Sequence, residues 1–456
     1  MERPNAWKQY DEASLNELKE ISQKYRVFLD NGKTERECVT ETVAAAKAAG
    51  YIDLNDAIKA GKALKPGDKV YVNCMGKAVM LFHLGEAPLT EGVNIVGAHI
   101  DSPRIDFKQN PFYEDTDLAY ADTHYYGGIK KYQWVARPMA LHGVVAKKDG
   151  TLVNVVIGED ADDPVVGISD ILIHLAGEQM GKKASEAVTG EALDVLLCGQ
   201  PLAGEEKDAV KANVLKLLDD KYGVEEEDFL SAELEIVPAG KARDMGFDRS
   251  MILGYGHDDR VCAYAELKAI FDTETPDRTA VCVLADKEEI GSMGVSGMQS
   301  RAFETFMADL CEQQDVHLRD CFENSFCVSA DVCNAYDPTF WDVSEYPNRN
   351  GARANYGVGI CKFTGSRGKY GANDAHPEYI GWLRGVLNRK NIPWQMAELG
   401  KVDHGGGGTV ALYLAAYGMD TIDLGPAVLS MHSPFELLSK ADLYSTKLAY
   451  QAILEA

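Results

Sequence analysis

The sequence predicts an α/β fold in which a three-layer α/β/α domain is interrupted by an inserted, β-rich domain. Two apolar runs, at residues 92–98 and 280–285, have the length and composition of strands buried on both faces of a parallel sheet. After Gly254, strand-like runs alternate with helical patterns, which is typical of such a sheet. This alternation is absent from the middle of the chain. We therefore expect the three-layer domain to comprise residues 1–104 and 253–456, and the inserted domain to comprise residues 105–252.

Length and charge restrict the class of protein. The 456 residues exceed the usual size of one hydrophobic core, so two domains are expected. The formal net charge of −25 disfavours binding to nucleic acid or to an anionic membrane. No run approaches the roughly 20 apolar residues of a transmembrane helix, and the polar N-terminal residues predict no signal peptide. The 10 cysteines form no CxxC pair, which indicates reduced thiols and a cytoplasmic location.

The first part of the three-layer domain should begin with two helices. Apolar residues recur at spacings of three and four through residues 12–30, which predicts an amphipathic helix. A second helix is expected from about residue 37 to residue 49, where Gly50 ends it. Three strands should follow, at residues 69–73, 77–84 and 92–98.

The insertion has a different character. Residues 105–133 are rich in aromatic and polar side chains without a clear period. Val and Leu alternate on both sides of a Lys-Lys-Asp-Gly turn, which predicts a hairpin over residues 141–157. A helix at about residues 207–222 and a strand at residues 232–237 should complete a small separate sheet.

Beyond the insertion, helices and strands should alternate. The expected helices cover residues 261–273, 301–314, 377–388 and 409–417, and the expected strands cover residues 280–285, 325–330 and 421–424. Sites in open α/β sheets form beyond the carboxyl ends of the strands. The polar residues that follow each strand are therefore the candidate site.

The strand at residues 280–285 is followed by two adjacent carboxylates, Glu288 and Glu289. Neighbouring residues at a strand end point in different directions, so one carboxylate can bind a cation while the other reaches a water on it. A metal hydrolase needs this combination of a metal that acidifies water and a base that takes its proton. An adjacent Glu pair more often lies on the solvated surface. The pair therefore indicates a metal site only in combination with other candidate ligands.

Further imidazoles and carboxylates occupy equivalent places. They are His99, Asp101, Asp258, Asp259, Asp331 and His432. Each has a structural alternative: a buried core histidine, a cap of a turn or helix, an ordinary loop residue, or a surface histidine. Together they supply the mixed nitrogen and oxygen donors that suit zinc and similar divalent metals.

Five segments carry a resemblance to a known family. GAHIDSPRID, GHDDR, DKEEIGS, SADV and LGPAVLSMHSPFE, in this order, resemble the M18 metalloaminopeptidases, the group of aspartyl aminopeptidase and vacuolar aminopeptidase I. The resemblance implies two divalent metal ions, Zn²⁺ first and Co²⁺ or Mn²⁺ as substitutes. It implies that His99 and Asp331 bind one ion, that Glu289 and His432 bind the other, and that Asp258 bridges both. It also implies that Glu288 is the general base and that Asp101 orients the ring of His99.

The resemblance implies a cytoplasmic aminopeptidase that acts on peptides with a free N-terminus. Lys362 and Gly406 would bind the substrate, the latter within a glycine run before a helix whose dipole favours an oxyanion. Asp259 stands where the aspartyl branch has Asn, and no His-rich stretch follows Asp331, so the resemblance does not extend to a preference for acidic residues. Two other readings stay open. One is a related two-metal carboxypeptidase or amide deacylase, and the other is a catalytically dead, self-assembling cargo protein.

Assembly is the last expectation. In the resembling family the inserted domain pairs subunits, and the dimers build a tetrahedral dodecamer. A histidine of the insertion reaches a neighbouring active site, and His174, in an apolar stretch, matches it. The alternative is that His174 fills the core of the insertion.

Overall fold

The computed structural model describes residues 3–347 and 349–456. Its chain divides into two compact units. The first comprises Met1–Asp101, Ala242–Met431 and Glu436–Ala456, and the second comprises Ser102–Lys241 and His432–Phe435. Residues 242–252, which were expected in the insertion, form a hairpin of the first unit, and a short segment that contains His432 joins the second unit.

A nine-stranded mixed sheet forms the centre of the first unit. Its strands, in spatial order, are β1 (Ile52–Asp53), β2 (Lys69–Cys74), β3 (Ala78–His83), β13 (Thr279–Ala285), β4 (Val93–His99), β14 (Phe326–Ser329), β20 (Asp420–Gly425), β16 (Val358–Cys361) and β18 (Trp394–Met396). The four neighbours β13, β4, β14 and β20 are parallel. Their carboxyl ends therefore lie along one edge of the sheet.

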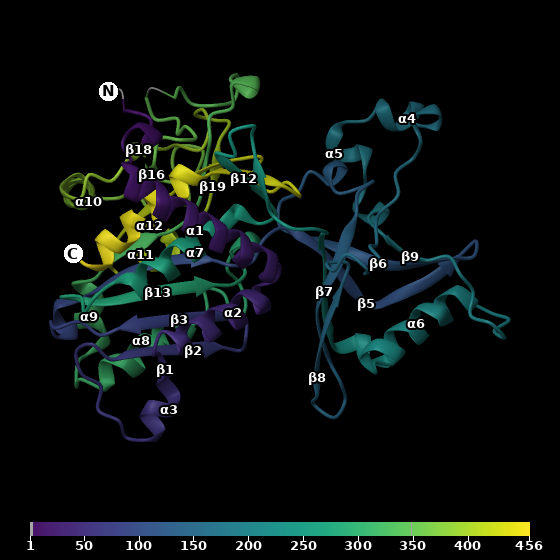
Figure 1. The fold of residues 1–456 in the computed structure, drawn as a ribbon, viewed down its shortest axis with the longest axis horizontal. Coiled ribbons are helices and arrows are strands. Elements are labelled where there is room, and N and C mark those ends of the chain that lie inside the picture. The colour runs from purple at the N-terminus through teal and green to yellow at the C-terminus, as the bar shows by residue number, and fades with distance from the viewer. Residues whose placement is uncertain (1–2, 348) are drawn as a thin grey trace. The chain divides into compact units, whose positions relative to one another are not determined.

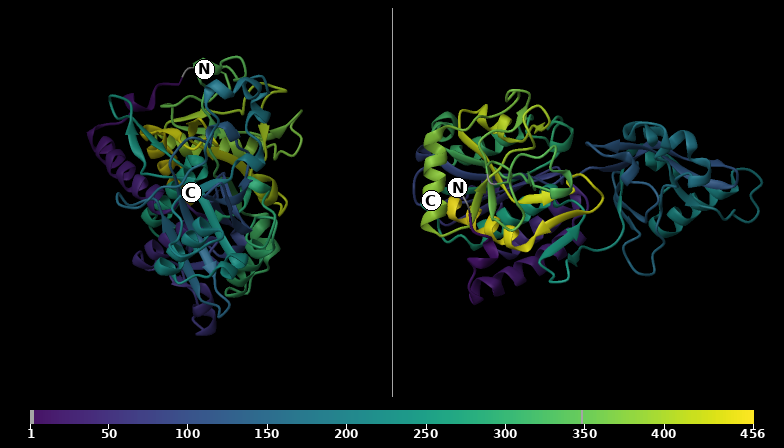
Figure 2. Two further views of the ribbon diagram at one scale, coloured as in Figure 1. Left: turned by 90° about the vertical axis from the view of Figure 1, so that its right-hand side faces the viewer. Right: turned by 90° about the horizontal axis from the view of Figure 1, so that it is seen from above.

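Helices cover both faces of this sheet (Figures 1 and 2). One face carries α1 (Glu12–Asn31), α2 (Glu35–Ala48), α7 (His257–Asp272), α10 (Pro377–Arg389) and α12 (Lys440–Leu454). The other carries α3 (Leu54–Lys59), α8 (Ala302–Glu312), α9 (Leu318–Glu323) and α11 (Ala411–Ala415). In β13, Cys282 packs into the first core while Val281 and Val283 pack into the second. Since alternate residues of a strand face opposite sides, an uninterrupted apolar run serves both cores, and the α/β class expected from the sequence is confirmed.

Two smaller sheets complete the first unit. One contains β11 (Arg243–Met245), β12 (Met251–Gly254), β22 (Glu436–Ser439), β21 (Ala427–Leu429) and β15 (Cys333–Asn334). The other pairs β17 (Gly365–Ser366) with β19 (Gly406–Gly407). No helix within the described residues is long and apolar enough to cross a membrane.

The second unit is built on a six-stranded antiparallel sheet. Its order is β8 (Leu152–Ile157), β7 (Met139–Ala146), β10 (Ala232–Pro238), β5 (Arg104–Asp115), β6 (Leu118–Tyr126) and β9 (Val195–Cys198). It also contains α4 (Gly177–Met180), α5 (Ala184–Ala187) and α6 (Ala209–Tyr222). The hairpin of β5 and β6 was not predicted, because a register shift between Phe107 and Phe112 breaks the alternation of side chains.

Candidate metal centre

Three adjacent strands deliver the candidate groups to one edge of the nine-stranded sheet. His99 is the last residue of β4. Glu288 and Glu289 follow β13 in a 3₁₀ turn, Glu288–Ile290, and Asp331 follows β14. Because β4 lies between β13 and β14 and is parallel to both, these ends are neighbours. The parallel order of these strands brings segments that are distant in the sequence to one edge of the sheet.

Asp258 enters the same place from the start of α7. Its backbone and that of Asp259 are not helical, and the peptide bond between them is cis. The N–H of Asp258 donates to Oε2 of the buried Glu436 at 2.9 Å. Sequence reasoning did not single out Glu436, although it closes the MHSPFE segment.

His257 anchors this turn from inside the core. Its Nε2 lies 3.2 Å from the carbonyl oxygen of Ile252, which can only accept, so Nε2 carries the proton. Its Nδ1 then accepts from the hydroxyl of Tyr25 at 2.7 Å. Burial lowers the pKa of His257 to about 3, so the ring is neutral at pH 7. A fixed neutral ring therefore precedes Asp258.

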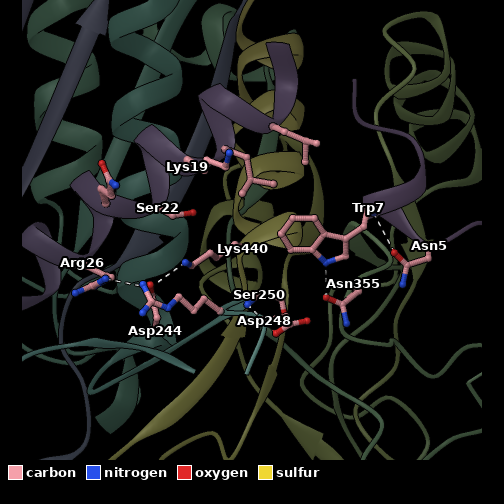
Figure 3. Close-up of a pocket in the computed structure, with 14 residues that line it drawn as sticks. Asn5, Trp7, Lys19, Ser22, Arg26, Asp244, Asp248, Ser250, Asn355 and Lys440 are labelled. Atoms are coloured by element: carbon pink, nitrogen blue, oxygen red, sulfur yellow. Dashed lines mark hydrogen bonds and ion pairs between the residues drawn. The ribbon is translucent and has the colours of Figure 1, made fainter. Parts of the chain in front are cut away.

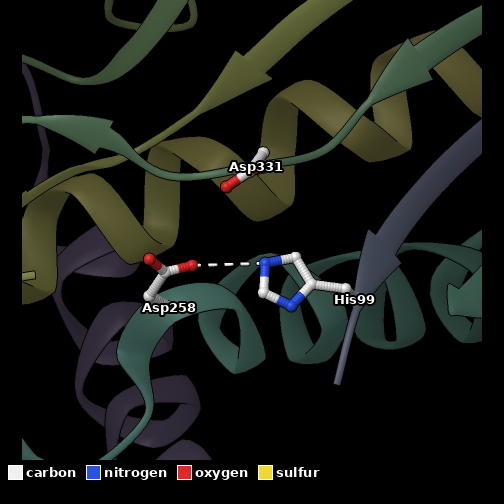
Figure 4. A group of neighbouring side chains, drawn as sticks. All are labelled: His99, Asp258 and Asp331. Carbon is white, nitrogen blue, oxygen red and sulfur yellow. Dashed lines mark ion pairs between the residues drawn. The ribbon is translucent and has the colours of Figure 1, made fainter. Parts of the chain in front are cut away.

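His99, Asp258 and Asp331 form one donor group (Figure 4). Each offers a ligand atom, and these atoms lie within 4.8 Å of one another. Nε2 of His99 is 3.3 Å from Oδ1 of Asp258 and 3.9 Å from Oε2 of Glu288. One imidazole nitrogen and two carboxylates at this spacing are the donors that a zinc site uses.

The electrostatics of the group also suit a cation. Burial opposes a charge on His99, but hydrogen bonds to Asp101 and Asp258 raise its pKa well above its ordinary value. Burial, followed by repulsion from Asp259, raises the pKa of Asp331. Oδ1 of Asp259 is buried and has no hydrogen-bond partner within the described part of the chain. So many carboxyl groups around one imidazole are unfavourable without a positive charge, and a divalent ion fits them.

Asp101 connects His99 to the Glu pair. Its main-chain oxygen lies 2.9 Å from Nδ1 of His99, which must donate to it, so Nε2 is the nitrogen that can bind a metal. Its side-chain Oδ1 is also 3.3 Å from Nδ1. The same carboxylate accepts the N–H of Glu288 at 3.1 Å and that of Glu289 at 3.2 Å. Asp101 thus holds the turn that carries both glutamates as well as the histidine ring.

His432 belongs to the second unit. Its Nδ1 lies 2.8 Å from the carbonyl oxygen of Gly128, to which it must donate. This hydrogen bond leaves Nε2 as the nitrogen that can accept a proton or bind a metal. Its assignment as a ligand stays a prediction.

Of the candidate substrate residues, Lys362 is partly exposed and Gly406 is exposed. Nζ of Lys362 is ion-paired with Oδ1 of Asp374, whose other oxygen is 2.9 Å from Nζ of Lys369. Gly406 pairs with Ser366 in the short ladder of β17 and β19, at a φ of +146°. The helix expected to follow the glycines is shorter than predicted, because α11 has only five residues.

His174 lies in a 3₁₀ turn, Ile173–Leu175, and is exposed. The alternative that it fills the core of the insertion is therefore wrong. Large apolar side chains around it are exposed as well; they are Ile171, Leu172, Ile173, Leu175 and Met180.

A cavity lies elsewhere in the first unit, beside α1 (Figure 3). It has a volume of about 790 Å³. Three of its charged groups satisfy one another, since Asp244 is bound by Arg26 at 3.0 Å and by Lys440 at 2.8 Å. Trp7 Nε1 donates to Asn355 Oδ1 at 2.9 Å. This cavity contains none of the candidate ligands.

Comparisons with known proteins agree with the geometry. The family described as "Aminopeptidase I zinc metalloprotease (M18)" matches residues 28–454. A probable M18 family aminopeptidase 1 of Clostridium acetobutylicum is 55% identical over 458 residues, covering 99% of this chain and 98% of that protein. A crystal structure of an M18 aminopeptidase from Thermotoga maritima superposes with a TM-score of 0.95 at 44% identity, covering 100% of this chain and 99% of the other. An mApe1 dodecamer from S. cerevisiae, with a TM-score of 0.72 at 21% identity and coverage of 95% of each chain, shares the fold.

Proposed function

Because the chain belongs to the M18 family of zinc metalloaminopeptidases, and is therefore a peptide hydrolase, we propose that it uses a two-metal centre with Glu288 as general base. The observation that carries the proposal is the pair of hydrogen bonds from Glu288 and Glu289 to Asp101. They fix the backbone of two adjacent glutamates beside a histidine, and each carboxylate would serve a different task.

The ligands are assigned by donor chemistry. His99 and Asp331 would hold one ion, Glu289 and His432 the other, and Asp258 both. Zn²⁺ is the first choice, and Co²⁺ or Mn²⁺ can use the same nitrogen and oxygen donors. When bound, such ions would lower the pKa of a coordinated water to about 7 and would polarise the substrate carbonyl.

Glu288 is the base in this proposal. Its side chain is partly exposed, and its Oε2 is 3.9 Å from Nε2 of His99, so it can reach a water beside the ligands. It accepts the proton of the attacking water and returns it to the departing amine. Its backbone is fixed by Asp101, so the carboxylate needs little reorganisation between the two transfers.

The substrate would be a peptide with a free N-terminal amine. The many carboxyl groups around His99 attract an ammonium group, which favours removal of the first residue. Lys362 and Gly406 would bind the rest of the substrate. Because Lys362 is ion-paired with Asp374, a preference for an acidic first residue would require that pair to open.

Assembly would complete the enzyme. The second unit would pair subunits through the exposed apolar residues around His174. Dimers would build a tetrahedral dodecamer in the cytoplasm, and His174 would serve the active site of a neighbouring subunit.

The test uses Glu288→Gln and Glu289→Gln. The first keeps size and packing but cannot accept a proton, so we expect a rate loss of roughly 10²- to 10⁴-fold with metal retained. The second should lower the metal content, as measured by elemental analysis. The assignment is reversed if Glu288→Gln loses metal and Glu289→Gln keeps full activity.

A free-amine peptide and its N-acetylated form separate the proposal from its alternatives. An aminopeptidase cleaves only the free-amine form. A carboxypeptidase or an amide deacylase also acts on the acetylated form, and a dead cargo protein acts on neither.

A further inference from the structure

A second pocket of the first unit has an unusual charge. It has a volume of about 290 Å³ and lies beside α10 and β18. Four arginines line it, and no described Asp or Glu does; the arginines are Arg3, Arg349, Arg353 and Arg384. The chain as a whole has a formal net charge of −25, whereas the charged residues described in this pocket are all positive. Such a local inversion indicates a site for an anion.

Two of these cations share one aromatic ring. Cζ of Arg3 lies 3.5 Å from the ring centroid of Trp394, and Cζ of Arg384 lies 5.8 Å from the same centroid. Burial, followed by repulsion from Arg384, lowers the pKa of Arg3. Neither arginine forms an ion pair with a described carboxylate. Since Arg384 repels Arg3, an anion near both guanidinium groups would be favourable.

Arg353 adds a buried donor without an acceptor. Its guanidinium lies 3.5 Å from the ring centroid of Tyr356. The main chain of Arg353 is fixed by Gln395, whose side chain accepts its N–H and donates to its carbonyl oxygen, both at 2.8 Å. The side-chain Nε is buried and has no hydrogen-bond partner in the described part of the chain. Arg353 thus brings a positive charge and an unsatisfied donor to the residues that line the pocket, and an anionic acceptor would compensate both.

We propose that this pocket binds a compact, multiply charged oxyanion of the phosphate class. Arginine presents several N–H groups in a plane that matches phosphate oxygens, and converging arginines favour a ligand with more than one charge. The volume exceeds that of a single phosphate and suits two linked phosphoryl groups. Since Arg3 covers the ring of Trp394, a nucleobase cannot stack on that face, so inorganic pyrophosphate and a nucleoside diphosphate should be recognised through the same phosphoryl groups. The site is separate from the metal centre and does not depend on the proposed function.

Calorimetric titration of the metal-loaded protein with inorganic pyrophosphate tests the proposal. We expect saturable binding that weakens as NaCl is added. Arg353→Gln and Arg384→Gln should each bind at least about tenfold more weakly, because each loses a charge-assisted hydrogen bond. Both variants should keep the peptidase activity. Arg319→Gln, at an exposed arginine outside the pocket, is the matched control and should bind like the unsubstituted protein.

Two further measurements identify which part of the ligand is recognised and whether the metal centre is involved. ADP should bind and adenosine should not, whereas equal binding of adenosine would overturn recognition through phosphate. Pyrophosphate also binds metals, so Glu289→Gln serves as the second control and should retain pyrophosphate binding. The proposal is wrong if the unsubstituted protein shows no saturable binding. It is also wrong if the arginine variants bind equally well, or if only Glu289→Gln loses binding.

Discussion

The main-chain N–H of Glu288 donates to Oδ1 of Asp101 at 3.1 Å. The two residues are far apart in the sequence, yet this bond and its neighbour from Glu289 link the end of β4 to the end of β13. The main-chain oxygen of Asp101, and not only its carboxylate, contacts the ring of His99. Orientation of His99 and placement of the glutamates are therefore separable functions of one residue.

Asp101→Asn should separate them. The amide oxygen can accept one of the two N–H groups, but the amide nitrogen faces the other donor, while the main-chain contact to His99 survives. We expect kcat to fall by roughly 10- to 100-fold with most of the metal retained. Steady-state kinetics and metal analysis of the same sample check this. Loss of metal before loss of kcat would show that the main function of the carboxylate is to orient His99.

His174 tests whether active sites are shared between subunits. If it acts in a neighbouring subunit, subunits with Glu288→Gln mixed with subunits with His174→Ala should recover activity, because a hybrid pair contains one complete site. Recovery is measured after co-refolding or co-expression, with hybrids verified by two affinity tags. Verified hybrids that stay inactive would contradict shared sites, and a fully active His174→Ala enzyme would do so sooner.

Lys362→Ala should change substrate preference. If its ammonium faces the first side chain of the substrate, kcat/KM should fall more for Asp- or Glu-initiated peptides than for Leu-initiated ones. Lys369→Ala is the matched control, because Lys369 contacts the same Asp374 at 2.9 Å. An equal loss for both kinds of peptide would remove Lys362 from the substrate site.

The pH dependence of stability should include a contribution from His83. This residue ends β3, its Nδ1 is buried without a partner among the described residues, and burial followed by repulsion from Lys69 lowers its pKa to about 4. The unfolded chain, with a pKa of about 6.5, binds the proton more readily. The buried neutral ring therefore makes its full contribution to the free energy of unfolding above about pH 6.5. This contribution is lost as the pH falls toward 4.

His83→Gln removes this dependence. Between pH 7.5 and pH 5, the unsubstituted protein should lose about 2 kcal/mol more of its free energy of unfolding than the variant. Denaturant titrations at the two pH values measure the difference, and His317→Gln, at an exposed histidine, is the control. Parallel losses in the unsubstituted protein and in His83→Gln would contradict the assignment.

Much of the first unit could be predicted because its strands are buried on both faces. The apolar runs that became β4 and β13 are uninterrupted, and the polar residues after them mark the edge where sites form. Helix ends were less accurate. For example, α2 begins two residues early because the side chains of Thr34 and Glu37 form a reciprocal cap.

The remaining features depend on contacts between distant residues. In the sequence, Asp101 has the context of a turn residue. Only the parallel register of β4 and β13 brings its carboxylate to the N–H groups of Glu288 and Glu289. The hairpin of β5 and β6 was hidden by its bulge. The arginine pocket joins residues from four separated segments, none of which has an informative pattern alone.

The helix α12 has a consequence for the order in which the chain can fold during synthesis. It packs with α1 and α7 over one face of the nine-stranded sheet, and the hydroxyl of its buried Tyr450 donates to the carbonyl oxygen of Leu424 at 2.7 Å. The opposite face is covered by helices that all precede residue 416. A nascent chain can therefore close one side of the sheet while α1, made first, still exposes Leu18 and Ile21, which in the folded chain pack with Ala441 and Tyr444 of α12. This surface stays open until residues 440–454 have left the ribosome, so the first long helix of this protein is the one that most needs a chaperone.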